Sequence, residues 1–285
     1  MPDPIIRRTL LCSVCRYDLE GLSARGNCPE CGHDIVASLA ARLDLGARQA
    51  LEFPGARRMA WALTLAAVGA LAGTGILATA VFEFISIRAN APTSATILIN
   101  VLRSGPTVAL VGASIGFVAM LGVLPWTNRD GMLRCRVLGT LGFTLWIVAA
   151  LEQPSLGWML GATGAGAIAL IAIAPLFKQL GPRSRVYRSR QTAAQPFNAL
   201  LLALFGAGSC GGLANGLPSL RKITPALADT IELASTVLWL TATACAATLV
   251  FGLLYLVVNA VWILCAVMRP APDADSILGS DEHDE

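Results

Sequence analysis

Residues 230–268 read TIELASTVLWLTATACAATLVFGLLYLVVNAVWILCAVM, and this apolar run decides the class of fold. The run has 39 residues and a single acid, Glu232. One helix needs about 20 apolar residues to cross roughly 30 Å of hydrocarbon, so the run is nearly twice as long as one crossing requires. We expect one long helix that projects from the bilayer. The alternative is a fold-back into two spans at Gly252 or Asn259, which would give seven spans in all.

The rest of the chain is equally apolar. Mean hydropathy is +0.65 and 14% of the residues are charged, against about 25% in soluble proteins. We therefore predict an all-α polytopic membrane protein with about six transmembrane helices, which form a bundle over residues 59–268. The expected spans are 59–82, 106–126, 137–151, 157–177, 196–217 and about 231–258.

The distribution of basic residues gives the expected orientation. With the N-terminus inside and six crossings, 17 of the 21 lysines and arginines fall on the inside and 4 on the outside, as the positive-inside rule requires. No apolar leader follows Arg7 and Arg8. We expect a multi-pass protein of the inner (cytoplasmic) membrane, with the bilayer as its solvent and the N-terminus in the cytoplasm.

A cluster of cysteines precedes the first span, in residues 12–32, CSVCRYDLEGLSARGNCPECG. Two C-x-x-C turns separated by a short hairpin are typical of a tetrahedral four-cysteine zinc site. We predict that Cys12, Cys15, Cys28 and Cys31 bind a structural Zn²⁺ ion, and that residues 1–34 form a small β-hairpin zinc ribbon. Cytoplasmic thiols stay reduced, which favours metal over disulfides.

The string CSVCRYDLEGL…CPECGHD resembles the zinc ribbons that open many uncharacterised bacterial multi-pass membrane proteins, with the pattern C-x-x-C-G-Y-D-L-x-G-L…C-P-E-C-G. This resemblance implies a zinc ribbon on a membrane protein and brings no activity. Arg16 stands where the pattern has glycine. The spacing is also similar to the rubredoxin-like knuckle of rubrerythrins, which implies iron and one-electron transfer as the less favoured alternative.

The sequence bears on three kinds of possible partner: protein, nucleic acid and anionic lipid. A protein partner is expected at the ribbon, through Tyr17, Leu19 and Leu22, although these residues would also serve to pack the hairpin. Nucleic acid is disfavoured, because residues 1–34 hold four arginines against five acids and lack an aromatic, basic face. Residues 178–195 hold five bases and no acid, which suits anionic lipid head groups or simply fixes topology.

Two further segments flank the bundle. Residues 35–58 are expected to be an amphipathic connector whose helix is capped by Asp34 and ends near Gly46, and which lies on the ribbon or on the lipid surface. The tail 269–285 has six acids and a single base, Arg269, and we expect it to be disordered.

The spans themselves carry small residues four apart, which lets helix backbones approach closely. These residues are Gly69 and Gly73, Gly112 and Gly116, Gly157 and Gly161, and Gly208, Gly212 and Gly216. No ionisable group sits at a span centre and no catalytic motif is present, so no enzyme activity is expected. A small-solute transporter is the second alternative, and Asn259, the one amide deep in an apolar run, is its candidate residue.

Overall fold

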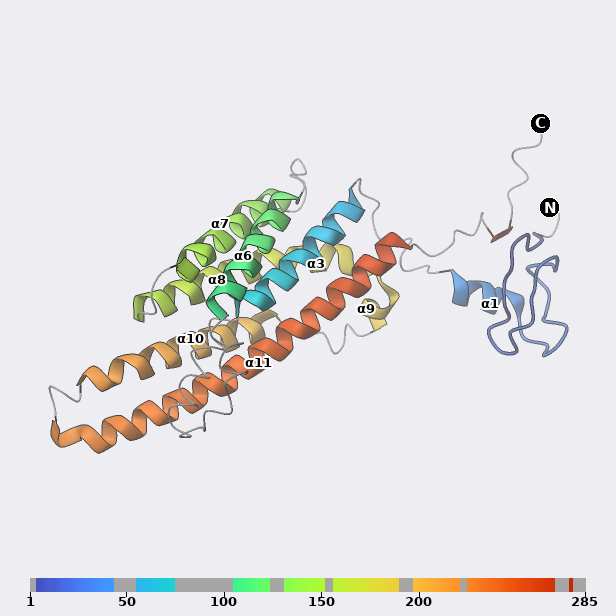
Figure 1. The fold of residues 1–285 in the computed structure, drawn as a ribbon. Coiled ribbons are helices and arrows are strands. Elements are labelled where there is room, and N and C mark those ends of the chain that lie inside the picture. Colours follow the sequence, from blue (N-terminus) through green and yellow to red (C-terminus); the bar gives the residue numbers. More distant parts are fainter. Residues whose placement is uncertain are drawn as a thin grey trace, which may run out of the picture.

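The computed structural model describes residues 4–43, 55–74, 105–123, 131–151, 156–189, 197–220, 225–269 and 277–278. These residues form a helical bundle preceded by a small N-terminal module (Figure 1). The helices, in chain order, are α1 (Ile35–Arg42), α3 (Ala56–Gly73), α6 (Gly105–Leu121), α7 (Met132–Leu151), α8 (Leu156–Leu180), α9 (Arg185–Ser189), α10 (Phe197–Leu220) and α11 (Ala228–Met268), with short 3-10 turns η2 (Gly181–Arg183) and η4 (Pro225–Leu227).

Four of the described helices are long and apolar enough to cross a membrane, namely α7, α8, α10 and α11. The predicted count of six spans is not supported, although a helix occurs at each of the six expected positions. Helix α6 has 17 residues, about 26 Å of length against roughly 30 Å of hydrocarbon. Helix α3 has 18 residues and carries Arg57 and Arg58 in its first turn, which lowers its hydropathy.

The apolar run that opened the sequence analysis is one continuous helix. Helix α11 has 41 residues, which corresponds to about 60 Å, so the chain does not fold back at Gly252 or Asn259. Its first half lies beside α10, and its second half lies beside α3 and α9 (Figure 1). Helix α11 therefore extends beyond what one crossing needs, as expected for the single-helix alternative.

Glycines bring α3 and α6 into backbone contact. A Cβ atom added at Gly69 would lie 2.6 Å from the carbonyl oxygen of Gly112 and 2.8 Å from the nitrogen of Gly116. A Cβ at Gly142 on α7 would similarly lie 2.7 Å from the nitrogen of Ala169 on α8. No side chain fits at these crossings. The predicted close approach of small residues is confirmed for Gly69 with Gly112 and Gly116, whereas the contact of Gly142 with Ala169 was not predicted.

Large apolar side chains cover the outside of the described helices. Leu202 on α10 is 74% exposed and Phe251 on α11 is 72% exposed. Helices that bury small residues inside and expose Leu, Val and Phe outside would be unfavourable in water. This arrangement is the one expected for helices in contact with lipid.

The N-terminal module comprises residues 4–43. Its backbone is joined by three isolated antiparallel bridges, Ile5 with Ser23, Leu11 with Asp18, and Asn27 with Asp34. No strand longer than a bridge occurs in these residues, so the predicted β-hairpin is not confirmed. Helix α1 packs on the module through buried Ile35, Ser38 and Leu43; the module therefore extends past residue 34, the predicted boundary. Residues 44–54 of the predicted connector, Gly46 among them, lie outside the described residues.

Part of the acidic tail also belongs to this module. Ile277 is 4% exposed and lies in the same apolar cluster as Ile6, Leu10 and Leu19, with Leu278 packed against it. The prediction of disorder for 269–285 is therefore wrong for these two residues. That prediction came from composition, which does not show that an adjacent aliphatic pair packs against the apolar cluster of the module.

Candidate metal centre

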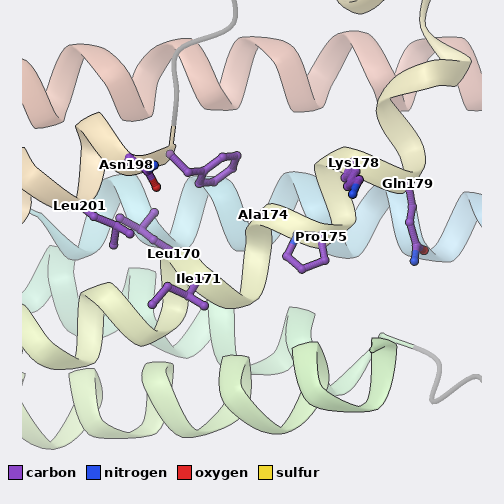
Figure 2. A pocket seen from close by; sticks show the side chains of 9 residues that line it. Leu170, Ile171, Ala174, Pro175, Lys178, Gln179, Asn198 and Leu201 are labelled. Carbon is purple, nitrogen blue, oxygen red and sulfur yellow. The ribbon is translucent and has the colours of Figure 1, made fainter. Parts of the chain in front are cut away.

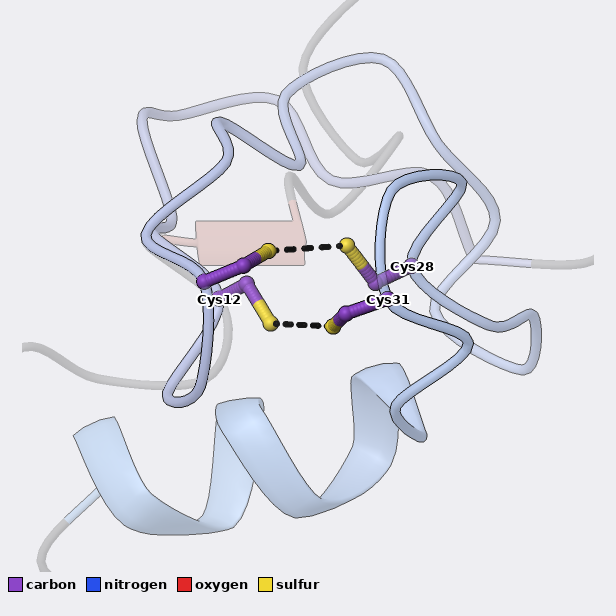
Figure 3. A group of neighbouring side chains, drawn as sticks. Cys12, Cys28 and Cys31 are labelled. Carbon is purple, nitrogen blue, oxygen red and sulfur yellow. Dashed lines mark hydrogen bonds between the residues drawn. The ribbon is translucent and has the colours of Figure 1, made fainter.

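The four predicted cysteines converge on one point. Their Sγ atoms all lie within 4.8 Å of one another, with 3.6 Å between Cys12 and Cys31 and 3.5 Å between Cys15 and Cys28 (Figure 3). A disulfide would need a separation of about 2.05 Å, and all four thiols are free. Four sulfurs at about 2.3 Å from a tetrahedral Zn²⁺ would be about 3.8 Å apart, which the cluster matches.

The two C-x-x-C turns repeat the same backbone pattern. The N–H of Cys12 donates to the carbonyl of Tyr17 at 2.8 Å, and the N–H of Cys28 donates to the carbonyl of His33 at 2.8 Å. In each turn the donor is the first cysteine and the acceptor lies five residues later. Because the two turns have the same hydrogen bond, each turn places its two sulfurs in the same way, one pair on either side of the site.

Each turn closes on a residue in the left-handed conformation. Arg16 has φ 63° and Gly32 has φ 68°, and their N–H groups donate to the carbonyls of Cys12 and Cys28 at 3.1 and 2.8 Å. Glycine adopts this conformation freely, whereas arginine does so at a cost. Arg16 is thus the position where the first turn departs from the pattern, and the turn still forms.

Backbone N–H groups point at the sulfurs and tune their ionisation. Those of Cys15 and Val14 lower the pKa of the Cys12 thiol to about 6. At Cys15 the N–H of Tyr17 favours the thiolate, but desolvation and the neighbouring thiols prevail and raise the pKa to about 12. At Cys31 the N–H of His33 also favours the thiolate, yet desolvation leads to a raised pKa.

Four thiols this close do not all ionise on their own, because each thiolate disfavours the next. A divalent cation removes this conflict and makes the four-thiolate state accessible. The donor set, its spacing and its N–H groups therefore fit a soft or borderline metal such as zinc or iron. Which metal is bound is not decided by this geometry.

Helix α1 supplies a contact that sequence reasoning missed. Ser38 is 2% exposed; its Oγ lies 4.0 Å from the Sγ of Cys12 and accepts a hydrogen bond from the N–H of Ser13 at 3.2 Å. The predicted cap is confirmed, since the Asp34 carboxylate accepts from the N–H of Val36 at 2.9 Å. The spacing of Ile35, Ser38 and Leu39 on one helical face was the available signal.

The four-cysteine cluster has no open ligand position for catalysis, and it lies close to the protein surface. Cys12 and Cys28 are buried, whereas Cys15 and Cys31 are exposed. Four cysteines fill a tetrahedral site, so no position is left for a substrate or an activated water. His33 is not one of the clustered ligands. Tyr17 is 41% exposed and gives the site little aromatic shielding.

A second feature lies in the bundle, between α8 and α10. A cavity of about 740 Å³ opens there, with Lys178 and Gln179 at one end and Asn198 beside the apolar side chains of Leu201 and Leu170 at the other (Figure 2). Pro175 breaks the α8 ladder at the cavity, since proline has no N–H to donate to the carbonyl of Ile171. The lining residues are Leu170, Ile171, Ala174, Pro175, Lys178, Gln179, Phe197, Asn198 and Leu201.

Asn259, the predicted candidate of the transporter alternative, is buried in the bundle. It is 5% exposed, and its Oδ1 atom has no hydrogen-bond partner among the residues that the structure describes. Thr64 on α3 reaches the neighbouring Ala260 carbonyl of α11 at 3.4 Å. The residue next to Asn259 therefore contacts α3, and Asn259 itself is not among the residues that line the cavity.

Comparisons with known proteins add no identity to this description. No protein-family model, no curated protein and no solved structure matches the chain.

Proposed function

We propose that this chain is a multi-pass inner-membrane protein whose cytoplasmic N-terminal module is a structural zinc ribbon used for protein contact or assembly. The observation that carries the proposal is the convergence of four sulfurs within 4.8 Å. A module of about 40 residues is too small to be stable through its apolar core alone, and a structural metal is the usual remedy.

The exposed apolar residues of the first turn support a role in protein contact. Val14 is 63% exposed, Leu11 44% and Tyr17 41%. Of the three residues expected to form this spot only Tyr17 belongs to it, because Leu19 is fully buried and Leu22 packs against the core. Apolar side chains held out on a rigid metal-bound turn are suited to a partner's surface.

The experiment that tests the metal is elemental analysis and a visible spectrum of the full chain purified from its native cells. One zinc per chain and no visible absorption are expected. One iron with a red, reducible chromophore would replace this proposal with the alternative, an electron-transfer module on a membrane anchor. Native cells are needed because an overproducing host can load the wrong metal.

The contact role has its own test. A photo-crosslinker placed at Val14 in living cells is expected to give a discrete adduct, and the same probe at Val36, which is 48% exposed on α1, is the control. The adduct should disappear on Leu11→Asp while the metal content stays at one ion per chain. Equal labelling from Val14 and Val36 would contradict a specific contact surface.

Two contacts support an even number of crossings, with both ends on one side of the membrane. The Nη1 atom of Arg185 donates to the carbonyl of Ala41 at 2.9 Å, and Arg7 is hydrogen-bonded to Ile277. The module, the basic loop near α9 and the segment after α11 therefore lie together, as an even number of crossings requires. A reporter enzyme that is active only on the non-cytoplasmic side of the membrane should be inactive when it is fused after Arg42 or after Arg269.

The cavity favours a second role, binding of an anionic lipid at the basic 178–195 region. Its apolar wall suits an acyl chain, and Lys178 at the polar end suits a phosphate. Lys178→Gln is expected to remove the thermal stabilisation that phosphatidylglycerol gives over phosphatidylcholine in vesicles. Arg134→Gln on α7 is the matched control, and an equal loss there would reduce the effect to general surface charge.

A further inference from the structure

The C-terminal tail carries a short segment that is seated in the N-terminal module. The carbonyl of Ile277 accepts a hydrogen bond from the N–H of Arg7 at 2.9 Å. The Ile277 side chain is 4% exposed within the cluster that includes Ile6 and Leu10. Ile277 comes nine residues after Met268, the last residue of α11, so it belongs to the tail and not to the helical bundle.

The tail offers only one apolar anchor of this kind. Ile277 and Leu278 are adjacent aliphatic residues between Asp275 and Asp281, in a segment rich in acids. The backbone segment that receives Ile277 carries Arg7 and Arg8, which are both exposed. Peptides that bind along an open backbone edge are recognised by backbone hydrogen bonds and by side-chain anchors. The tail has an aliphatic anchor, a backbone hydrogen bond and a charge opposite to that of Arg7 and Arg8.

The reach of the chain agrees with docking in the same molecule. Ile277 is eight residues beyond Arg269, the residue at which α11 is capped, and eight residues span at most about 28 Å. A segment tethered this closely has an effective concentration of the order of millimolar at its site, so it outcompetes free ligands of moderate affinity.

We propose that the module has a docking groove for a short aliphatic peptide flanked by acids, and that the chain's own segment around Ile277 and Leu278 occupies this groove in cis. The groove is formed at the backbone of Arg7 and the apolar cluster around Ile6 and Leu10. This assignment requires neither a particular metal nor a partner protein, so it stands or falls separately from the proposed function.

The first measurement is amide hydrogen exchange of the full chain in detergent, metal loaded. The Arg7 amide is expected to be protected in the native chain and in Ile277→Val, which keeps the aliphatic anchor. In Ile277→Asp its exchange should be at least about tenfold faster, because the acceptor is no longer held. Equal Arg7 protection in all three chains would overturn the proposal.

The second measurement uses a fluorescent peptide of residues 270–285. It should bind the Ile277→Asp chain at least about tenfold more tightly than the native chain, whose groove is occupied. An Ile277→Asp peptide should not bind either chain. Equal binding to both chains, or no binding to the vacated groove, would overturn the proposal.

Two controls keep these results interpretable. One metal ion per chain in Ile277→Asp shows that the module is still folded; if the ion is lost, a chain ending at Arg269 replaces this variant in both assays. A photo-crosslinker at Leu278 should give an adduct with the module of the same chain. Adducts between two chains would overturn the cis assignment in favour of a second copy's tail.

Discussion

Replacing Cys28 by serine is the sharpest perturbation of the module. Cys28 is 2% exposed, and its Sγ lies 3.5 Å from that of Cys15. Binding of a structural zinc ion contributes about 10–16 kcal/mol in small modules of this type. That is as large as the entire stability of a typical domain, about 5–15 kcal/mol. Losing one of four thiolates, together with the cavity left by the smaller side chain, is therefore expected to unfold the module.

The helical bundle should stay folded when the module unfolds. The apolar cluster of the module contains no residue of the membrane helices, and the main cluster of the bundle contains no residue of the module. Cys28→Ser is thus expected to lose its metal and to expose residues 4–43 to protease, while α3 through α11 remain inserted and protected. The two apolar clusters are the reason for expecting this separation.

The assay combines metal content with limited proteolysis in native membranes, followed by mass spectrometry of the fragments. Cys265→Ser is the matched control, because Cys265 is exposed on α11 and belongs to no ligand cluster. It should keep one metal ion per chain and a protected module. A Cys28→Ser chain with unchanged metal content and unchanged cleavage of residues 4–43 would refute the reasoning.

Three further changes test the packing and the turns. Gly69→Ala should separate α3 from α6 and lower the thermal stability in detergent by several degrees, since a Cβ there would lie 2.6 Å from Gly112 O; Gly161→Ala, which meets open space, should not. Arg16→Gly, at φ 63°, should raise the stability of the metal-loaded module by up to about 1 kcal/mol, measured by resistance to chelator. Asn259→Leu removes a buried amide with an unpartnered oxygen and should leave stability unchanged or raise it; loss of solute flux in proteoliposomes would instead favour the transporter alternative.

The four-cysteine cluster could be predicted because its information is local. Two C-x-x-C turns fix their own backbone, and the equivalence of Arg16 and Gly32 follows from their places after Cys15 and Cys31. The Asp34 cap was likewise readable, since it depends on a side chain and an N–H two residues away. Helix α11 was predicted as one helix for a similar reason, because nothing inside the run forms a turn.

The features that were missed depend on contacts between distant segments. Ser38 approaches Cys12 only because α1 folds back over the first turn. Its place on the apolar face of the helix could be read from the sequence, but its contact with Cys12 could not. The count of spans failed for a different reason. Hydropathy marked where apolar helices occur, but the described parts of α3 and α6 have 18 and 17 residues, fewer than the spans expected there.

The attachment of the module to the bundle can be ranked by the chemistry of its contacts. The hydrogen bond from Arg185 to the Ala41 carbonyl is exposed, and such a bond contributes about 0.5–1.5 kcal/mol at most, so alone it would leave the module free to move. The docked segment buries an isoleucine, worth about 1.5–3 kcal/mol, in addition to a backbone hydrogen bond. If the docked segment contributes more to the attachment, Ile277→Asp should increase the mobility of the module more than Arg185→Ala does. Comparable mobility in the two variants, measured by a spin label on the module, would place the main attachment at α9 instead.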